Sequence, residues 1–229
     1  MNAVSETISA KQPLGVAAYE QIYRRIMTLE YVPGQPLDEK TLMAELGIGR
    51  TPIREALLRL SSDFMVESSP NRGCIVRPIT LQNTRAAFAA LKIMELGVAE
   101  LAMKQDNASF LPLMSRANDE VDAAVKQNDI IGLVEANSRF HAYFARCSRN
   151  DYLVHALGQV RCETNRLAYL SFGNEIDPLR TLGEHYKSVV AQHRKIIACL
   201  QHHDEDCLKA TLQEHSRIFQ NRIVMYMAS

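Results

Sequence analysis

Every strong β-strand or turn signal in this 229-residue chain precedes residue 80, and the remaining sequence follows a helical pattern throughout. Apolar residues that recur three and four positions apart mark the buried face of an α-helix, whereas strands alternate with a period of two. Thr80 is a suitable N-cap for a long helix, which places a boundary at residues 78–82. We therefore expect a mostly α protein with two domains, a mixed unit over residues 1–79 and an all-α bundle over residues 80–229.

The first domain has the order helix, helix, helix, hairpin. Helical spacing covers residues 16–30, a second helix follows Asp38 and stops at Gly47, and a third opens with RTPIREALLRL. Two β-prone stretches, FMVESS and CIVRPI, come next and are separated by turn residues. This order is typical of a winged helix-turn-helix, whose second short helix projects its N-terminal end into the DNA major groove.

The start of this third helix carries two arginines that could contact DNA. Arg50 and Arg54 are four residues apart and therefore share one helical face. The apolar stripe of the same helix, which includes Ile53 and Leu57, lies opposite and can face the core. Arginine pairs bidentately with guanine or with phosphate, so this face could contact base edges. A solvated helix face is the alternative interpretation.

Other candidate DNA contacts surround these arginines. Thr51 is suited to a phosphate contact, and Lys40 and Arg72 add positive charge on the preceding helix and at the wing tip. Gly73 can supply a backbone conformation that a side chain would hinder. The candidate DNA-binding residues are Lys40, Arg50, Thr51, Arg54, Arg72 and Gly73.

Overall charge and composition restrict the remaining classes. The 26 basic and 26 acidic residues cancel, so net charge does not indicate a nucleic-acid partner. No stretch approaches the roughly 20 apolar residues of a membrane span, and the N-terminus lacks the apolar core of a signal peptide. We expect a soluble, cytoplasmic protein with no membrane partner. The five cysteines are odd in number and form no CxxC pair, which favours reduced thiols that pack in the interior.

The bundle is expected to contain six helices. They cover the segment from Thr80 to Gln105 and then about residues 108–127, 129–148, 150–172, 177–202 and 204–227. His141 lies on the third of them, one turn after Asn137, while His193 and His215 lie on the last two, which the HHDED turn makes antiparallel neighbours. Three imidazoles and an amide oxygen form a ligand set for a divalent metal, Zn²⁺ first and Ni²⁺ or Mn²⁺ as alternatives. Hydrogen-bonded core histidines are the other interpretation.

The segment over residues 17–80 resembles the DNA-binding domain of the GntR family of bacterial transcription regulators, with no gap and with the specific strings RTPIREAL and PNRG. The resemblance implies operator contacts at the matching positions, namely Lys40, Arg50, Thr51, Arg54, Arg72 and Gly73. One departure is Phe64, where the family usually carries a glycine before the first strand of the wing. We expect Phe64 to adjust the turn and to leave the fold intact.

Residues 81–229 resemble the FCD-type all-α effector domain of the FadR subfamily of GntR regulators. In many members an acidic residue four positions before a histidine, together with two histidines on the last helices, binds a metal. His141, His193 and His215 match these histidines, and Asn137 takes the place of the acidic residue.

Two departures from that pattern bear on the ligand. Asn137 offers a neutral oxygen, which weakens the metal site and leaves a more positive centre for an anionic effector. Leu91 stands four residues before Glu95, where many relatives have an arginine, so the usual carboxylate contact is missing and the effector class stays open.

Helical spacing also suggests neighbours for the metal site. The candidates for the effector pocket are Phe144, Arg161, Asn165, Tyr186 and Arg222, with Arg166 as a further possible anion partner. Simple packing or an exposed charged face explains each of them equally well.

These features favour a ligand-responsive transcription regulator that is not an enzyme. By resemblance it is a repressor that binds double-stranded operator DNA as a homodimer and holds a small organic acid on a metal. A constitutive DNA-binding protein with structural histidines is one alternative, and a metal-dependent hydrolase is another. Against the hydrolase, Glu214 beside His215 points about 100° away on an ideal helix and is no well-placed general base.

Overall fold

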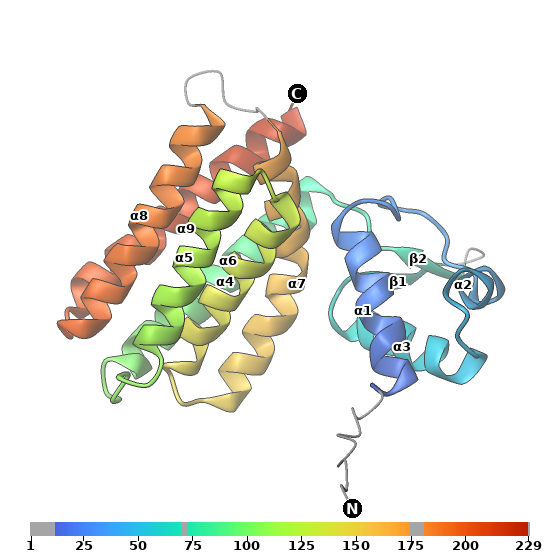
Figure 1. The fold of residues 1–229 in the computed structure, drawn as a ribbon, viewed down its shortest axis with the longest axis horizontal. Helices are drawn as coiled ribbons and strands as arrows, with labels where there is room; N and C mark the ends of the chain where they lie inside the picture. Colours follow the sequence, from blue (N-terminus) through green and yellow to red (C-terminus); the bar gives the residue numbers. More distant parts are fainter. Residues whose placement is uncertain (1–11, 70–72, 175–180, 229) are drawn as a thin grey trace, which may run out of the picture.

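The computed structural model describes residues 12–69, 73–174 and 181–228, and Figure 1 shows two parts side by side. We call the first part, which contains three helices and a two-stranded sheet, the winged unit, and the second, which contains six helices, the helical bundle. The expected fold class, a winged helix-turn-helix followed by an all-α bundle, is confirmed. None of the helices in the described ranges is long and apolar enough to cross a membrane.

The winged unit contains every strand in the described ranges. Its elements are α1 (Leu14–Met27), α2 (Glu39–Leu46), α3 (Arg50–Ser62), β1 (Val66–Ser69) and β2 (Gly73–Val76). The strands pair antiparallel. Helix α2 begins and ends as the sequence predicts, because the Asp38 carboxylate accepts a hydrogen bond from the Thr41 backbone N–H and Gly47 adopts the left-handed conformation.

The turn between α3 and β1 explains why Phe64 is tolerated in place of glycine. Phe64 takes a positive φ of 58°, a conformation that side chains rarely adopt. Its ring receives the Arg77 guanidinium at 5.1 Å from the ring centroid. The winged unit forms with Phe64 in this turn, so the expectation of an intact fold is confirmed, and the adjustment of the turn stays a prediction.

The helical bundle follows a short connection after β2. Its helices are α4 (Leu81–Ala102), α5 (Leu111–Gln127), α6 (Ile130–Arg146), α7 (Asp151–Gly173), α8 (Leu182–Gln201) and α9 (Glu205–Ala228). The Thr80 hydroxyl caps α4 by accepting from the Asn83 backbone N–H. Helix α8 begins at Leu182, after a capping box of Thr181 and Glu184, rather than at residue 177, and residues 177–180 lie outside the described ranges.

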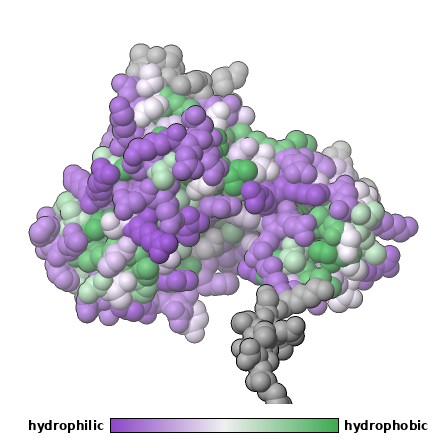
Figure 2. All heavy atoms as spheres, viewed as in Figure 1, coloured by the Kyte–Doolittle hydropathy of each residue, from purple (hydrophilic) through white to green (hydrophobic). Residues whose placement is uncertain are grey.

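Helix α7 connects the two parts of the molecule. It packs against α4, α6 and α9 within the bundle and also contacts α1 of the winged unit. Figure 1 shows it on the side of the bundle that faces α1, and Figure 2 shows hydrophilic side chains over most of the visible face around both parts. A side chain on α7 can therefore touch the bundle interior or the winged unit.

The expectation of five reduced cysteines is wrong for one pair. The structure joins Cys199 and Cys207 in a disulfide, because the antiparallel turn from α8 to α9 brings their Cα atoms to 5.8 Å. The remaining cysteines are free thiols that are buried or half-buried, as predicted. Burial raises the pKa of Cys147 and of Cys162 to about 12.

The winged unit has a hydrophobic core of its own. Its contribution to stability can be tested by substituting a buried and an exposed residue of α3. Ile53 is 0% exposed in that core, whereas Leu58 on the same helix is 71% exposed. We expect Ile53→Ala to lower the stability of the winged unit by roughly 2–5 kcal/mol, because it leaves a cavity. Leu58→Ala is the matched control and should change stability by less than about 0.5 kcal/mol.

Native-state hydrogen exchange is the appropriate measurement, because it reports each part separately. Amides of α1 and α3 should lose protection in Ile53→Ala, while those of α5 and α6 keep theirs. Equal losses in both parts would contradict the assignment of a separate core.

Candidate functional site

Two candidate sites lie in different parts of the chain, and the first is the exposed face at the start of α3. Arg50 opens the helix and Arg54 follows one turn later, with side chains 54% and 59% exposed. Both guanidinium groups approach Glu39 at the start of α2. The Arg54 Nε donates to Glu39 Oε1 at 2.8 Å, and the Arg50 Nε lies 3.8 Å from Glu39 Oε2.

Glu39 therefore holds the two arginines on one exposed face. A residue in this role escapes prediction from sequence, because the packing angle between α2 and α3 decides which side chains meet. Phosphate or guanine would compete with this carboxylate for the same donors.

The other candidate DNA contacts are exposed in the winged unit or lie outside the described residues. Lys40 and Thr51 are exposed near the starts of α2 and α3. Gly73 opens β2 with a φ of 67°, the backbone conformation for which glycine is suited, as the sequence suggests. Arg72 lies outside the described residues.

The second site is a group of three histidines inside the bundle. His141 on α6, His193 on α8 and His215 on α9 each offer one nitrogen, and these three atoms lie within 4.8 Å of one another. His141 and His193 are 2% and 0% exposed. The sequence pattern predicts this meeting of three helices, and the structure brings the three rings together.

Hydrogen-bond partners on the Nδ1 atoms orient two of the three rings, His193 and His215. His193 Nδ1 lies 2.9 Å from Asn118 Oδ1, and Asn118 Nδ2 donates to the Val190 carbonyl, which identifies the amide oxygen as the atom that faces the histidine. His215 Nδ1 lies 2.9 Å from Gln192 Oε1. These acceptors favour a proton on each Nδ1 and leave the Nε2 lone pairs free to bind a metal.

The third ring differs, because its Nδ1 atom has no hydrogen-bond partner among the described residues. His141 Nδ1 lies 3.8 Å from a carboxylate oxygen of Glu95, and its Nε2 lies 3.3 Å from His215 Nε2. His193 Nε2 is buried and has no hydrogen-bond partner among the described residues. Two facing Nε2 atoms and one buried, unpartnered Nε2 atom are the arrangement that a shared cation would satisfy.

Burial also sets the protonation state of the cluster. Loss of hydration lowers the pKa of His141 and His193 well below the usual histidine value, and the nearby Arg161 charge adds to the effect. Burial lowers the pKa of His215 to about 4, again with a contribution from Arg161. The imidazoles are therefore neutral near pH 7, the form in which histidine binds metals.

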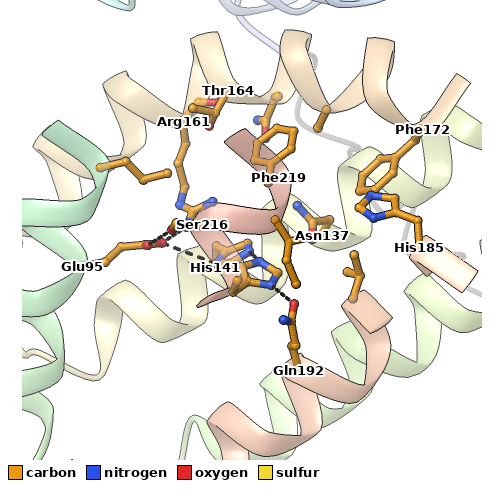
Figure 3. A pocket seen from close by; sticks show the side chains of 16 residues that line it. Glu95, Asn137, His141, Arg161, Thr164, Phe172, His185, Gln192, Ser216 and Phe219 are labelled. Atoms are coloured by element: carbon orange, nitrogen blue, oxygen red, sulfur yellow. Dashed lines mark hydrogen bonds and ion pairs between the residues drawn. The ribbon is translucent and has the colours of Figure 1, made fainter. Parts of the chain in front are cut away.

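A buried ion pair lies beside the histidines. Glu95 on α4 is 2% exposed and pairs with Arg161 on α7, and the Ser216 hydroxyl on α9 donates to the same carboxylate at 3.2 Å. Burial raises the pKa of Glu95, while the Arg161 charge opposes the shift. Figure 3 shows Glu95, Arg161 and Ser216 converging beside His141.

These groups line one cavity in the bundle, and its unfilled space is small. Leu91, Asn137 and Asn165 line it together with the ion pair and with two of the histidines, His141 and His215. The volume of about 30 Å³ holds about two water molecules or one metal ion. An organic ligand therefore requires the walls to move apart.

Several pocket candidates lie outside the described lining of this cavity. The Tyr186 hydroxyl donates to the Phe172 carbonyl, and Arg222 donates to the Ser171 hydroxyl and carbonyl. Phe144 is 1% exposed in the hydrophobic core. Helical spacing identifies a face of one helix, but the rotation of neighbouring helices decides whether that face meets the cavity.

Two more side chains depart from what spacing suggests. Arg166 is fully buried and pairs with Glu163 and with the Arg77 carbonyl, so it connects α7 to the winged unit rather than to an anion. His185, for which the sequence indicates no special role, is 1% exposed and lines the cavity.

A winged helix-turn-helix joined to a helical bundle with a cavity that holds an ion pair and histidines defines a DNA-binding regulator with a sensing domain. The FCD domain family matches residues 86–217, and the family of bacterial regulatory proteins called gntR matches residues 14–76. The chain belongs to the GntR family of transcription regulators, in the group with an FCD domain.

Known relatives agree with this membership. The HTH-type transcriptional repressor RspR of Escherichia coli K12 is 22% identical over 212 residues, which cover 93% of this chain and 90% of the relative. An uncharacterised HTH-type transcriptional regulator of Agrobacterium vitis is 29% identical over 135 residues, or 58% of this chain and 79% of the relative.

Solved structures show the same fold. The E. coli protein McbR/YncC has a TM-score of 0.78 at 19% identity and covers 95% of this chain and 99% of its own. A putative GntR regulator from Rhodococcus sp. RHA1 has a TM-score of 0.73 at 19% identity, with 92% and 97% covered.

The buried histidines predict a pH dependence of stability in metal-free protein. Unfolded histidine is protonated near pH 6.5, whereas folded His215 is protonated only near its lowered pKa of about 4. The unfolded state binds more protons between these values, so stability is present above about pH 6.5 and is lost as the pH falls toward 4. This histidine should contribute up to about 3 kcal/mol to the total loss of stability between these pH values.

Urea denaturation at about pH 7 and about pH 5 measures this effect. His215→Gln should flatten the dependence, whereas His155→Gln, at an exposed position on α7, should leave it unchanged. Identical pH dependence in wild type and His215→Gln would refute the buried neutral state.

Proposed function

We propose that this protein is a ligand-responsive repressor that binds operator DNA through the winged unit and senses a small organic acid through a divalent metal in the bundle. The observation that carries the proposal is the convergence of three neutral imidazoles, two of which line the cavity, within a chain that also carries a GntR winged helix. Repression is inferred from the family and from relatives named as repressors. Operator DNA places its action in the cytoplasm.

The DNA contacts are proposed for the exposed face of α3 and for the wing. Arg50 and Arg54 would contact base edges, with Thr51 and Lys40 on phosphates and Arg72 and Gly73 at the wing. The support is the exposure of both arginines and their common orientation by Glu39. Because the chain has no net charge, affinity must come from this local surface.

The metal ligands are proposed as His141, His193 and His215, with Asn137 as a weak fourth. The Nδ1 partners of His193 and His215 support this set, since each leaves an Nε2 atom available, and the Nε2 atom of His141 faces that of His215. Imidazole ligands suit Zn²⁺ and also Ni²⁺ or Mn²⁺. A bound ion supplies positive charge and open coordination positions for an anionic oxygen. The neutral Asn137 would leave more of that charge for the effector.

Arg161 is the positively charged side chain that would bind the carboxylate of an acidic effector, in addition to the metal. It lines the cavity from α7, whereas the position of the expected arginine on α4 is occupied by Leu91. Its pairing with Glu95 means that an incoming carboxylate would compete with a carboxylate that the protein already supplies. A non-enzymatic role is favoured because Glu214 is exposed and paired with Arg217, away from the cavity lining.

A homodimer with domains at residues 1–79 and 80–229 completes the proposal. Two winged units read two half-sites only when a dimer joins them. Ile93 on α4 is 71% exposed and Tyr152 on α7 is 90% exposed. These two adjacent helices offer apolar surface to a second copy. Each part has a hydrophobic cluster of its own, which supports the division, and Met27 of α1 joins a third cluster with bundle residues where the two parts meet.

The DNA assignment predicts a loss of affinity without a loss of stability. Arg50→Ala and Arg54→Ala should each weaken binding by roughly 1–3 kcal/mol, because each removes a bidentate contact. Arg116→Ala is the control, since its side chain is 82% exposed on α5 of the bundle. Fluorescence anisotropy with DNA selected from a random library measures the affinities. Full affinity in the double variant Arg50→Ala/Arg54→Ala would rule out this face.

The metal assignment predicts one divalent ion per chain in protein purified without chelator or affinity tag. The double variant His193→Gln/His215→Gln should bind none, because two of the three imidazoles are gone. Asn118→Ala should weaken binding about 10- to 100-fold by releasing the His193 ring. Asn137→Asp should tighten it by adding a charge.

Elemental analysis and isothermal titration with Zn²⁺ measure these outcomes. His155→Gln is the matched control, because it removes an exposed histidine from the same bundle. Wild-type protein that cannot be loaded with Zn²⁺, Ni²⁺ or Mn²⁺ at neutral pH would contradict the metal proposal and favour structural histidines.

A further inference from the structure

Ligand entry into the cavity must displace at least one of its walls. The unfilled volume of about 30 Å³ is that of about two water molecules, less than any organic acid needs. Helix α7 forms one wall through five residues spaced along one face, namely Arg161, Thr164, Asn165, Ala168 and Phe172. Because helices move as rigid elements, a displaced wall carries the rest of α7 with it.

Hydrogen bonds from three residues of the same helix are among the contacts that hold the winged unit. Gln159 Nε2 donates to the Ser62 carbonyl at the end of α3, at 3.1 Å. The fully buried Arg166 donates to the Arg77 carbonyl, in the connection that leads to α4. Asn165 Nδ2 donates to the Tyr23 hydroxyl of α1, at 3.1 Å.

Among these three contacts, Asn165 is the one made by a residue that also lines the cavity. It is 7% exposed, and its amide nitrogen donates a second hydrogen bond to the Ser138 hydroxyl on α6, at 3.1 Å. Both protons of this amide are therefore used, one toward α1 and one toward α6. A shift of Asn165 must break or move the contact with Tyr23.

A continuous set of contacts leads from Tyr23 to α3, the helix that carries the arginines. The Tyr23 ring stacks on Tyr19 with 5.8 Å between ring centroids. The Tyr19 hydroxyl donates to Asp63 Oδ2 at 2.7 Å, and Asp63 is the residue at which α3 ends. The Arg59 guanidinium of α3 lies over the same Tyr19 ring, 4.0 Å from its centroid.

We propose that Asn165 is a positioning residue that couples occupancy of the cavity to the placement of α3, through Tyr23 and Tyr19. The inference rests on the proposed sensing function and adds the residues that transmit it. An effector that pushes the α7 wall outward shifts Asn165, and the tyrosine pair transfers the shift to α3. Coupling of this kind is reciprocal, so DNA bound by the winged unit must also alter the cavity wall.

In the test, a larger side chain inside the cavity takes the place of the unidentified effector. Ala168 is 2% exposed and faces the cavity from α7, so Ala168→Leu inserts bulk where a ligand would lie. Tyr23→Phe removes only the hydroxyl that Asn165 contacts. DNA affinity is measured for the wild type, both single variants and the double variant, with DNA selected from a random library.

We expect Ala168→Leu to weaken DNA binding and Tyr23→Phe to leave it nearly unchanged. In the Tyr23→Phe background the effect of Ala168→Leu should shrink about fivefold, the factor that one hydrogen bond contributes. Tyr31→Phe is the matched control, because the Tyr31 hydroxyl bonds to Glu45 within the winged unit. Ala168→Leu should keep its full effect in that background.

A second measurement does not use the Ala168→Leu variant, so the proposal can still be tested if that variant folds poorly. DNA should change hydrogen exchange across residues 161–168 in the wild type and in Tyr31→Phe, and the change should be at most about half as large in Tyr23→Phe. Additive effects in the affinity cycle, or equal exchange changes in all three proteins, would overturn the proposal. Neither measurement uses a metal, so failure of the metal site is detected separately by the Zn²⁺ titration.

Discussion

The desolvation of polar groups inside the helical bundle is the constraint on which the rest of the structure depends. Burying imidazoles, a carboxylate and a guanidinium is costly unless each finds a partner, and most partners come from another helix. Asn118 on α5 serves His193 on α8, and Arg161 on α7 serves Glu95 on α4. These contacts specify how the helices are rotated, which apolar packing alone leaves less strictly defined. The cluster therefore determines the architecture and the chemistry of the cavity together.

The winged unit obtains its chemistry in a different way, from local placement on an exposed surface. Its helices bury one stripe, and the opposite face of α3 presents Arg50 and Arg54 next to Glu39. The Glu39 carboxylate beside the two arginines weakens their electrostatic attraction to any polyanion. It also keeps both guanidinium groups aligned as hydrogen-bond donors. Such a surface favours ligands whose hydrogen-bonding geometry allows them to displace Glu39. Sequence-selective DNA binding depends on this geometric selection more than on high positive charge.

The elements of the fold were predictable because their signals are local, whereas much of the site was not. Asp38 and Thr80 cap their helices as expected, and the three histidines meet because antiparallel neighbours leave few alternatives. Helical spacing could not place Tyr186, whose hydroxyl reaches the Phe172 carbonyl, because the rotation of α7 decides that contact. Asn118 carries no sequence signal at all, since its role depends on a helix 75 residues away in the chain. The disulfide between Cys199 and Cys207 is hidden for the same reason.

A small, tightly packed cavity with both polar and apolar walls is well suited to transmitting a signal. In a loosely packed site the side chains would absorb a ligand by changing rotamers, and the helices would stay where they are. The cavity of this protein has hydrogen-bonded walls, so side-chain adjustment costs partners as well as space. Asn165 illustrates the consequence, since both of its amide protons are already committed, to Tyr23 on α1 and to Ser138 on α6. Movement of α7 as a unit is then the less costly response, and α7 contacts α1 of the winged unit.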